Sequence, residues 1–583
     1  MLTLTHELSD MVADAFEGCG YGRDWGQVSG SDRLDLCQFQ CNGAFACAKR
    51  YHKAPLAIAE EVAAVLARNP LFARVDAAPP GFLNLTLSDA ALLARLAELA
   101  EDPHLGIPQE PGGTILIDYG GPNVAKPLHI GHLRSAIIGE SLKRLARAMG
   151  RTVLGDVHLG DWGLQIGLVI AELTDRHPDW RCFSPDFRPD EDGVPSLTPE
   201  LLAEVYPTAS GRSKDDPAFK EKAQRATGEL QQGRAGYLAL WREILRVSVE
   251  DLKTNYRRLQ VDFDLWYGES DAEPYVEPLL ARLRERHLLR ESEGALVVDV
   301  EEEGDKAPMP PVIVKKSDSS SIYATTDLAT ILQRERDFAP AEIWYVVDKR
   351  QSLHFTQVFR CAKKAGLVPP SARLEHLGFG TMNGSDGKPY KTRDGGVMRL
   401  SEFLDTVTDA AFSKMGDSAF VSKEEGPETA RRLGLAAVKF GDLVNHRTKD
   451  YVFDLDKFLA FEGKTGVYLL YTLTRIQSIL NKAGDPSGTC PSGIYTDVER
   501  ELILAMLLTG DAFSHAFAER APNIVCENAY RIASVFSRFY HDNHILGETD
   551  PDRRASWLSL CRLTKRLLLL QLDVLGIEPV DSM

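Results

Sequence analysis

The chain has 583 residues, which is enough for about four domain-sized units. Apolar residues make up 44% of it and charged residues 26%, as in ordinary soluble globular proteins. The net charge of −17 argues against indiscriminate nucleic-acid binding, because phosphate contacts need a local excess of cations. A local basic surface on this acidic body is still compatible with that charge.

Secretion and membrane insertion are not expected. No apolar run is long enough to cross a bilayer, and LTLTHELSDM at the amino end lacks the layout of a signal peptide. The nine cysteines are scattered and odd in number, so a disulfide framework is not predicted. Cys37, Cys41 and Cys47 lack zinc-ribbon spacing, so we interpret them as buried thiols rather than as a metal site. These features predict a reducing, cytoplasmic location and no membrane partner.

Residues 1–110 are predicted to form a small α/β unit. Residues 57–69 carry apolar side chains at helical spacing, and GFLNLTL at 81–87 alternates as a strand does. The stretch 101–113 is rich in proline and glycine and is the best candidate for a linker.

The second unit, predicted at 111–463, begins with a strand in TILIDYGG, residues 114–121. A helix is expected from Pro127 to Met149, with Gly150 just past its end. Further strands are expected within 151–163 and at 342–348, with helices between them. This alternation predicts a parallel sheet with crossover helices.

The pattern loosens between about 175 and 310 into a polar, helical insertion. From about residue 430 onward the chain is predicted to be helical almost throughout, and a third, all-helical unit is expected at 464–583. No fixed-period repeat and no low-complexity segment interrupts this order.

The stretch GGPNVAKPLHIGHLRS, residues 120–135, places two imidazoles at a strand-to-helix turn. His129 and His132 would share one face at the amino end of a helix, where unpaired N–H groups favour an anion. Gly131 leaves room for a flat or bulky group against the backbone. The stretch therefore predicts a polyphosphate cradle beyond a parallel strand. For the four-residue pattern alone, histidines that merely pack or face water are the alternative.

The wider stretch, PNVAKPLHIGHLRSAIIGESL, resembles the nucleotide-binding motif of class I aminoacyl-tRNA synthetases in its arginyl form, to which Asn123 and Lys126 belong. Further matches occur in order: GDWGLQIG at 160–167, YATTDLA at 323–329, DKRQSLH at 348–354, GKPYKTRDGG at 387–396, and LGIEPVDSM at the end. The resemblance implies a Rossmann-type α/β catalytic domain with helical insertions. It also implies an α/β amino-terminal tRNA-binding domain and an all-α carboxyl-terminal anticodon-binding bundle.

By this resemblance the chain ligates L-arginine to tRNA(Arg) through arginyl-adenylate. ATP with Mg²⁺ is the expected substrate complex, without a tightly bound cofactor or a dedicated metal site, and a monomer is the family's habit. Activation is an in-line attack of a carboxylate on the α-phosphorus, which positioning and charge stabilisation promote. Two other functions would fit the same fold: a paralogue that loads an amino acid onto a carrier other than tRNA, and a catalytically silent RNA-binding relative. The complete set of motifs argues against both.

The family's usual Lys-Met-Ser-Lys-Ser loop is missing. In its place, a segment at about 384–398 carries cations between glycines, which suits a mobile flap over a triphosphate. A solvated hairpin is the alternative from composition alone. The resemblance implies that Lys126 takes over the role of one missing lysine. The implied nucleotide-binding set is Lys126, His129, Gly131, His132, Lys388, Lys391 and Arg393.

Recognition of arginine requires carboxylates and neutral acceptors around a planar, permanently charged guanidinium. By resemblance, Asp327 pairs with the guanidinium, and Tyr323 and Gln351 complete its hydrogen bonds. Asp118 stands where the family often has an acid that meets the α-ammonium of arginine. The aspartate side chain reaches less far than a glutamate would. Without the resemblance, Asp327 would be interpreted as an ordinary helix-surface charge. The implied arginine-binding set is Asp118, Asn123, His129, Tyr323, Asp327 and Gln351.

Two further segments are implied to contact tRNA. Phe82 and Asn84 would stack on and hydrogen-bond an exposed D-loop base, although a strand's core residue is the alternative for Phe82. Tyr468, Tyr471 and Arg475 lie three and four residues apart on one predicted helix and could receive splayed anticodon bases. A buried aromatic stripe is the alternative for one of the tyrosines.

Overall fold

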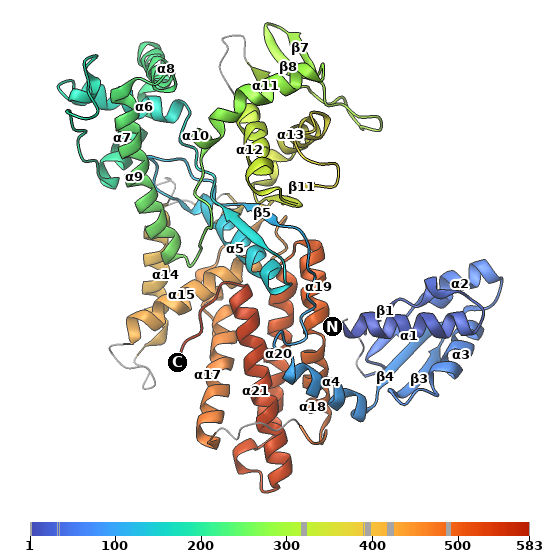
Figure 1. Ribbon diagram of the computed structural model, residues 1–583. Coiled ribbons are helices and arrows are strands. Elements are labelled where there is room, and N and C mark those ends of the chain that lie inside the picture. Colours follow the sequence, from blue (N-terminus) through green and yellow to red (C-terminus); the bar gives the residue numbers. More distant parts are fainter. Residues whose placement is uncertain are drawn as a thin grey trace.

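The computed structural model describes residues 3–581 except 32, 34, 316–322, 389, 391–397, 417–424 and 485–490. Figure 1 shows a central sheet with helical lobes above it, a helical bundle below, and the amino-terminal unit to one side. The mixed α/β fold class with a carboxyl-terminal helical region is confirmed.

The amino-terminal unit contains a four-stranded antiparallel sheet in the order β1-β2-β4-β3. On β4, the leucines face the core while Phe82 and Asn84 lie half-exposed on the opposite face. The predicted helix at 57–69 is α3, and the predicted strand at 81–87 is β4. The bounds are α1 Leu4–Gly18, β1 Val28–Gly30, β2 Phe39–Cys41, α2 Gly43–Tyr51, α3 Pro55–Leu66, β3 Phe72–Ala78, β4 Phe82–Leu87 and α4 Asp89–Glu101.

The central sheet has four parallel strands in the order β11-β10-β5-β6, as the alternating pattern predicts. The last residues of three neighbouring strands, Asp118, Asp156 and Tyr345, lie level with one another. Ligands bind beyond this edge in open parallel sheets. The bounds are β5 Ile115–Asp118, α5 Leu133–Ala148, β6 Val153–Asp156, α12 Tyr323–Phe338, β10 Glu342–Tyr345, α13 Ser352–Lys364 and β11 Arg373–His376.

The helix expected from Pro127 begins later than predicted. His129 has extended backbone angles, φ −129° and ψ 167°, and a 3-10 turn over Ile130–His132 precedes α5. Because an extended residue cannot belong to a helix, Pro127 lies outside it. The chain instead runs without a helix from Asn123 to His129 before the 3-10 turn.

The insertion is only partly helical. Helices α6 to α9 form one lobe, at the upper left of Figure 1, and a three-stranded antiparallel sheet follows in the other lobe. The bounds are α6 Leu164–Arg176, α7 Pro199–Asp215, α8 Pro217–Gln231, α9 Ala235–Arg258, α10 Glu269–Ala272, α11 Val276–Glu285, β7 Leu289–Ser292, β8 Ala295–Val298 and β9 Val312–Lys315.

The carboxyl-terminal third is a helical bundle (Figure 1). Contrary to the sequence expectation, one stretch, Asp497–Glu519, is long and apolar enough to cross a membrane by length and composition alone. It consists of the two bundle helices α18 and α19 and is largely buried, so it is weak evidence for a span. The bounds are β12 Met382–Asn383, α14 Leu400–Met415, α15 Gly426–Leu443, β13 Tyr451–Val452, α16 Leu455–Phe458, α17 Gly466–Ala483, α18 Asp497–Leu507, α19 Thr509–Glu519, α20 Asn523–Asp542 and α21 Pro551–Val574.

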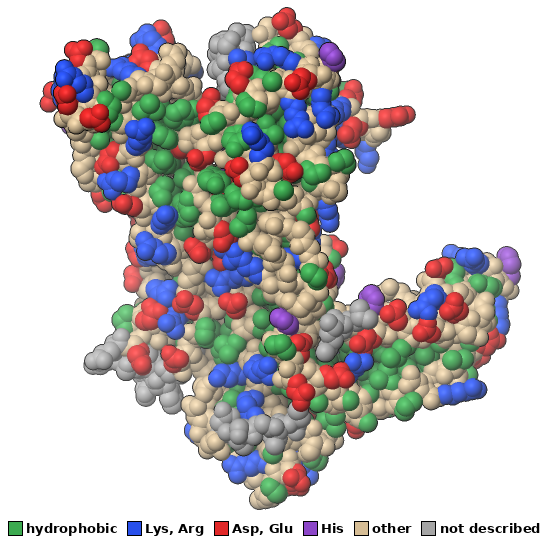
Figure 2. Space-filling view, in the orientation of Figure 1, with side chains coloured by type: hydrophobic (Ala, Val, Ile, Leu, Met, Phe, Trp, Pro, Cys, Tyr) green, Lys and Arg blue, Asp and Glu red, His purple; other side chains and the backbone are tan. Residues whose placement is uncertain are grey.

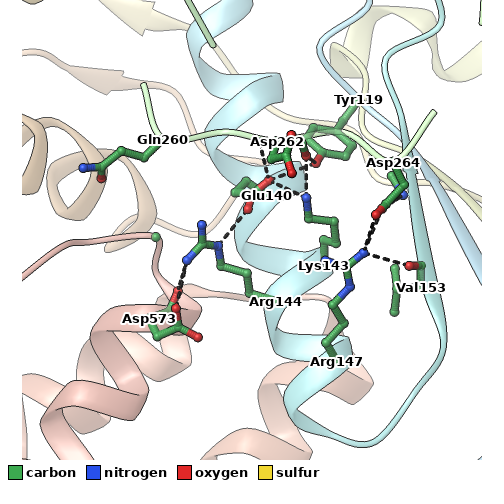
Figure 3. Close-up of polar contacts among 12 residues, drawn as sticks. Tyr119, Glu140, Lys143, Arg144, Arg147, Val153, Gln260, Asp262, Asp264 and Asp573 are labelled. Carbon is green, nitrogen blue, oxygen red and sulfur yellow. Dashed lines mark hydrogen bonds and ion pairs between the residues drawn. The ribbon is translucent and has the colours of Figure 1, made fainter. Parts of the chain in front are cut away.

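Helix α5 is tied to both the sheet and the bundle (Figure 3). Buried Glu140 accepts hydrogen bonds from Tyr119, which follows β5, and from Arg144 at 2.7 Å. Arg144 also pairs with Asp573 of α21 at 2.9 Å. The histidine turn therefore sits at the start of a helix whose position is fixed from both sides.

The cysteine cluster agrees with the sequence interpretation. Cys37, Cys41 and Cys47 are buried free thiols, and burial raises the pKa of Cys41 to about 11. The predicted domain borders at 110 and 463, and the predicted limits of the insertion and flap, stay predictions.

Candidate functional site

The histidine turn is built from its own hydrogen bonds. His129 caps the turn, and its Nδ1 accepts a hydrogen bond from the Gly131 N–H at 3.0 Å. The His129 backbone N–H donates to Nδ1 of His132 at 3.2 Å, and the two ring centres are 4.1 Å apart. Because Nδ1 of His129 is an acceptor, the neutral ring carries its proton on Nε2.

Both imidazoles are neutral at physiological pH. Burial, together with the neighbouring His129 ring, lowers the pKa of His132 to about 3. Burial first, and then the Lys126 ammonium, lowers the pKa of His129 as well. The pair can therefore donate hydrogen bonds to a phosphate without adding two buried charges.

Gly131 is required by the geometry of this turn. A Cβ built on it would lie 2.7 Å from Cε1 and 2.8 Å from Nδ1 of His129. Any side chain would therefore displace the imidazole. This supports the sequence argument that a glycine keeps the backbone open between the two rings.

A cavity of about 320 Å³ opens on the histidine turn. Arg134, 2% exposed, forms part of its wall and pairs with buried Asp442 at 2.9 Å. Small-molecule sites commonly combine apolar walls with a few fixed polar groups in this way. The cavity is lined by His129, Ile130, Gly131, Arg134, Asp348, Arg350, Phe379, Gly380, Thr381, Met382 and Tyr390.

The predicted cations of the nucleotide site are not all beside this cavity. Lys126 lines a second cavity of about 270 Å³, and its ammonium lies over the Tyr206 ring. Lys388 is exposed on the predicted flap, where its N–H bonds to Asp386 at 3.0 Å. Lys391 and Arg393 lie outside the described residues. Their nucleotide roles stay predictions.

The candidate arginine pocket begins at the first turn of α12. Tyr323 is 75% exposed, and half-buried Asp327 follows it by one helical turn. Asp327 Oδ2 lies 2.6 Å from Nε2 of His354 on α13, which leaves its other oxygen for a ligand. Gln351, exposed in the turn before α13, completes the predicted group. Figure 2 shows the surface hollowed between the two upper lobes that these helices and the insertion form.

Glu269 is a candidate pocket residue that the sequence analysis missed. Burial raises the pKa of Glu269, the charges of Asp161 and Asp327 raise it further, and His158 opposes this effect. Burial raises the pKa of Tyr323, and the charge of Glu269 raises it further. Helix α10 packs against α12, so Glu269 offers a second acid near Asp327 for the fork of a guanidinium. Glu269 lies in the short helix α10, and no motif in its surroundings distinguishes it.

Asp118 is buried at the end of β5 and paired within the protein. Arg334 donates from one nitrogen to Asp118 at 2.7 Å and to Asp156 at 2.6 Å. Asp118, Asp156 and His158 lie close enough together to hold a metal, but both carboxylates already pair with the single Arg334 guanidinium. The predicted contact of Asp118 with the α-ammonium would therefore share this acid with Arg334, and it stays a prediction.

Asn123 lies beside the segment that follows β6. It bridges to Gly160, and a Cβ on that glycine would lie 2.1 Å from the Asn123 side-chain oxygen. The GDWG motif thus provides the space in which Asn123 is seated. The predicted contact of Asn123 with the backbone end of the substrate is not tested by this geometry.

The predicted D-loop contacts lie on the open face of the amino-terminal sheet. Phe82 packs edge to face on Phe45 at 5.1 Å, and Asn84 accepts a hydrogen bond from Gln40 at 2.9 Å. Half-exposed placement disfavours a core role for Phe82. Stacking and hydrogen bonding by these residues stay predictions.

The predicted anticodon residues divide into two groups. The Tyr468 hydroxyl lies 2.9 Å from Ser537 Oγ on α20, so this ring packs between helices. Arg475 bonds to the Tyr471 hydroxyl at 2.6 Å and lies over the rings of Tyr471 and Tyr540. The half-exposed Arg475 cluster is therefore the better candidate for contact with bases.

Comparison with known proteins supplies the family. The chain matches the models for tRNA synthetases class I (R), catalytic domain, at 97–455, for the DALR anticodon binding domain at 469–583, and for the arginyl tRNA synthetase N terminal domain at 3–87. The arginine–tRNA ligases of Alkaliphilus oremlandii and Agathobacter rectalis are 48% and 47% identical over the whole of both chains.

Solved structures agree on the fold. The arginyl-tRNA synthetases of Thermus thermophilus and Plasmodium falciparum have TM-scores of 0.82 and 0.81 to this chain. Both alignments cover all of each chain at 23% identity, which by itself shows the fold alone. Together with the family models and the curated relatives, these findings place the chain in the arginyl-tRNA synthetase family of class I.

Proposed function

We propose that the hollow beyond the strand edge is where this enzyme joins L-arginine to tRNA(Arg). ATP occupies the cavity on the histidine turn, and arginine lies with its guanidinium between Asp327 and Glu269. The single observation that carries this assignment is the neutral His129 ring, which lines the 320 Å³ cavity together with Gly131 and is held in place beside His132.

Two transfers complete the reaction. First, a carboxylate oxygen of arginine attacks the α-phosphorus of ATP while the bond to the bridging oxygen breaks, which gives arginyl-adenylate and pyrophosphate. Then a terminal ribose hydroxyl of the tRNA attacks the carbonyl carbon, and AMP leaves. Nε2–H of His129 can donate to phosphate oxygens, and no side chain needs to take up a proton in the first step.

ATP enters with Mg²⁺ as a substrate complex, and no tightly bound cofactor is required. The metal then comes with the triphosphate rather than from a protein cage, as is usual for Mg²⁺. We further propose a cytoplasmic monomer, which follows from the sequence composition and from the family's habit. A paralogue that serves another carrier and a catalytically silent relative are not favoured, because all three family models match in order.

The test is arginine-dependent exchange of pyrophosphate into ATP, measured with and without tRNA. Exchange is expected with arginine and tRNA together, and it should be weak without tRNA because the family usually needs tRNA for activation. Absence of exchange in the complete mixture would overturn the proposed activity. Robust exchange without tRNA would overturn only the tRNA requirement.

A further inference from the structure

The Lys126 side chain extends toward the insertion. Its Nζ lies 4.4 Å from the centre of the Tyr206 ring on α7, and both side chains are half-buried. A cation over the face of a tyrosine ring is attracted by the ring's negative face, more strongly where water is excluded. The contact therefore fixes the mobile end of a flexible side chain.

The Tyr206 ring is itself held in place. It packs against the main core and also against a small separate core inside the insertion. The small core consists of Leu168, Ala171, Ala209, Phe219 and Ala223. Pro207 follows Tyr206 within α7 and removes one helical hydrogen bond at that point. The ring is thus a fixed surface rather than a mobile partner.

The backbone beside Lys126 is held by the same lobe. The Ala125 N–H donates to Ser248 Oγ of α9 at 2.9 Å, and Ala125 has a left-handed φ of 61°. The neighbouring Val124 N–H bonds to the Gly160 carbonyl at 3.0 Å. Figure 1 shows α7 and α9 in the same lobe, so the insertion holds Lys126 at both its backbone and its ammonium.

Lys126 stands three residues before His129, in the segment that leads into the histidine turn. After burial, its charge is the next cause that lowers the pKa of His129, and it also contributes to the low pKa of His132. The lysine therefore combines a fixed position with an electrostatic effect on the two histidines, and it lines the cavity next to the proposed phosphate site.

We propose that Tyr206 is a positioning residue that holds the Lys126 ammonium where the triphosphate of ATP meets it. Negative charge moves onto pyrophosphate in the transition state, and a cation ordered in advance stabilises that charge without ordering its four-carbon stem in every turnover. This inference rests on the proposed nucleotide role of Lys126. It gives the insertion lobe a part in adenylate formation.

The test compares Tyr206→Leu with Tyr206→Phe in pyrophosphate exchange, with tRNA and arginine present. Leucine removes the ring face, so kcat should fall roughly threefold to thirtyfold while KM for arginine stays constant. Phenylalanine keeps the ring face and should retain the rate within about twofold. Tyr275→Leu, which removes a similar ring from under Arg336 outside both cavities, is the matched control.

A double-mutant cycle separates positioning from general damage to the fold. In a Lys126→Met background, Tyr206→Leu should have no further effect on kcat, and thermal melting should show that every variant is folded. An unchanged or faster Tyr206→Leu enzyme, or an equal loss in the Lys126→Met background, would overturn the proposal. Wild-type exchange by Lys126→Met alone would remove the nucleotide role of Lys126 and this inference with it.

Discussion

At the residue scale, the candidate site depends on a few side chains whose state is set by their surroundings. The pattern of His129, Gly131 and His132 could be predicted from sequence, because local spacing and a glycine define the turn. The pairing of Asp118 with Arg334 could not, because it joins residues 216 positions apart in the chain. Glu269 was missed for the same reason: only the fold brings it toward Asp327.

Asp327 tests the assignment of the arginine pocket. Asp327→Ala should lower kcat/KM for arginine roughly a hundredfold, because it removes a charge-assisted contact worth about 3 kcal/mol. KM for ATP should change little. Steady-state exchange at varied arginine and ATP gives both values. Asp337→Ala, on the exposed last turn of the same helix, is the control, and wild-type arginine kinetics in Asp327→Ala would refute the assignment.

His132 tests the neutral state of the histidine turn. Its pKa of about 3 lies below the ordinary histidine value of 6.5, so it stays unprotonated as pH falls through 6.5. His132→Asn should lower kcat about a hundredfold while its pH profile between 5.5 and 8 stays parallel to that of the wild type. If the wild type instead lost activity with an apparent pKa near 6.5 and the variant did not, the neutral assignment would be wrong.

At the element scale, hydrophobic periodicity predicts which strands and helices form, whereas specific contacts determine where a helix such as α5 begins. The buried strand at 114–121 and the crossover helices follow from apolar patterns, so the parallel sheet could be predicted. The start of α5 could not, because the extended conformation of His129 depends on its hydrogen bond to Gly131 rather than on helix propensity. The small sheet of β7, β8 and β9 was missed because it lies within a polar region that is otherwise helical.

Gly139 shows how tightly α5 packs on the strand edge. A Cβ there would lie 2.2 Å from the Tyr119 ring, so Gly139→Ala should destabilise the enzyme by about 1–3 kcal/mol or more. Gly228→Ala in α8 meets nothing within 4 Å and should stabilise by about 1 kcal/mol. Thermal melting of both variants measures the difference. Equal melting temperatures would contradict the packing of α5 described above.

At the scale of the whole molecule, buried polar contacts join the catalytic domain to the carboxyl-terminal chain. Lys439 of α15 is 1% exposed and donates to the Gly576 carbonyl at 2.5 Å, just beyond α21. The Arg144–Asp573 pair likewise joins α5 to α21 (Figure 3). Such contacts between distant segments cannot be predicted from the sequence, whereas the order of the three units can.

Lys439 predicts a pH-dependent stability. Burial, with the Arg144 charge, lowers the pKa of Lys439 from 10.5 to about 7. Between these two values the unfolded chain binds a proton that the folded enzyme lacks, so stability rises with pH. Lys439→Met removes this dependence and should melt at a higher temperature than the wild type near pH 7.5.

The advantage of Lys439→Met should shrink toward pH 9.5, by up to about 1.4 kcal/mol per pH unit. Melting temperatures measured across that range give the trend. Lys464→Met, which removes an exposed lysine paired with Glu527, should show no such trend. A constant difference between Lys439→Met and the wild type would mean that the buried amine keeps an ordinary pKa.

The central claim is that one hollow binds ATP on the histidine turn and selects arginine through its acid pair. Aminoacylation of total tRNA with each of the twenty amino acids in turn, in the presence of ATP and Mg²⁺, tests this claim most directly. Charging by arginine alone is the predicted result. Charging by another amino acid at a comparable rate, or no charging by arginine, would contradict it.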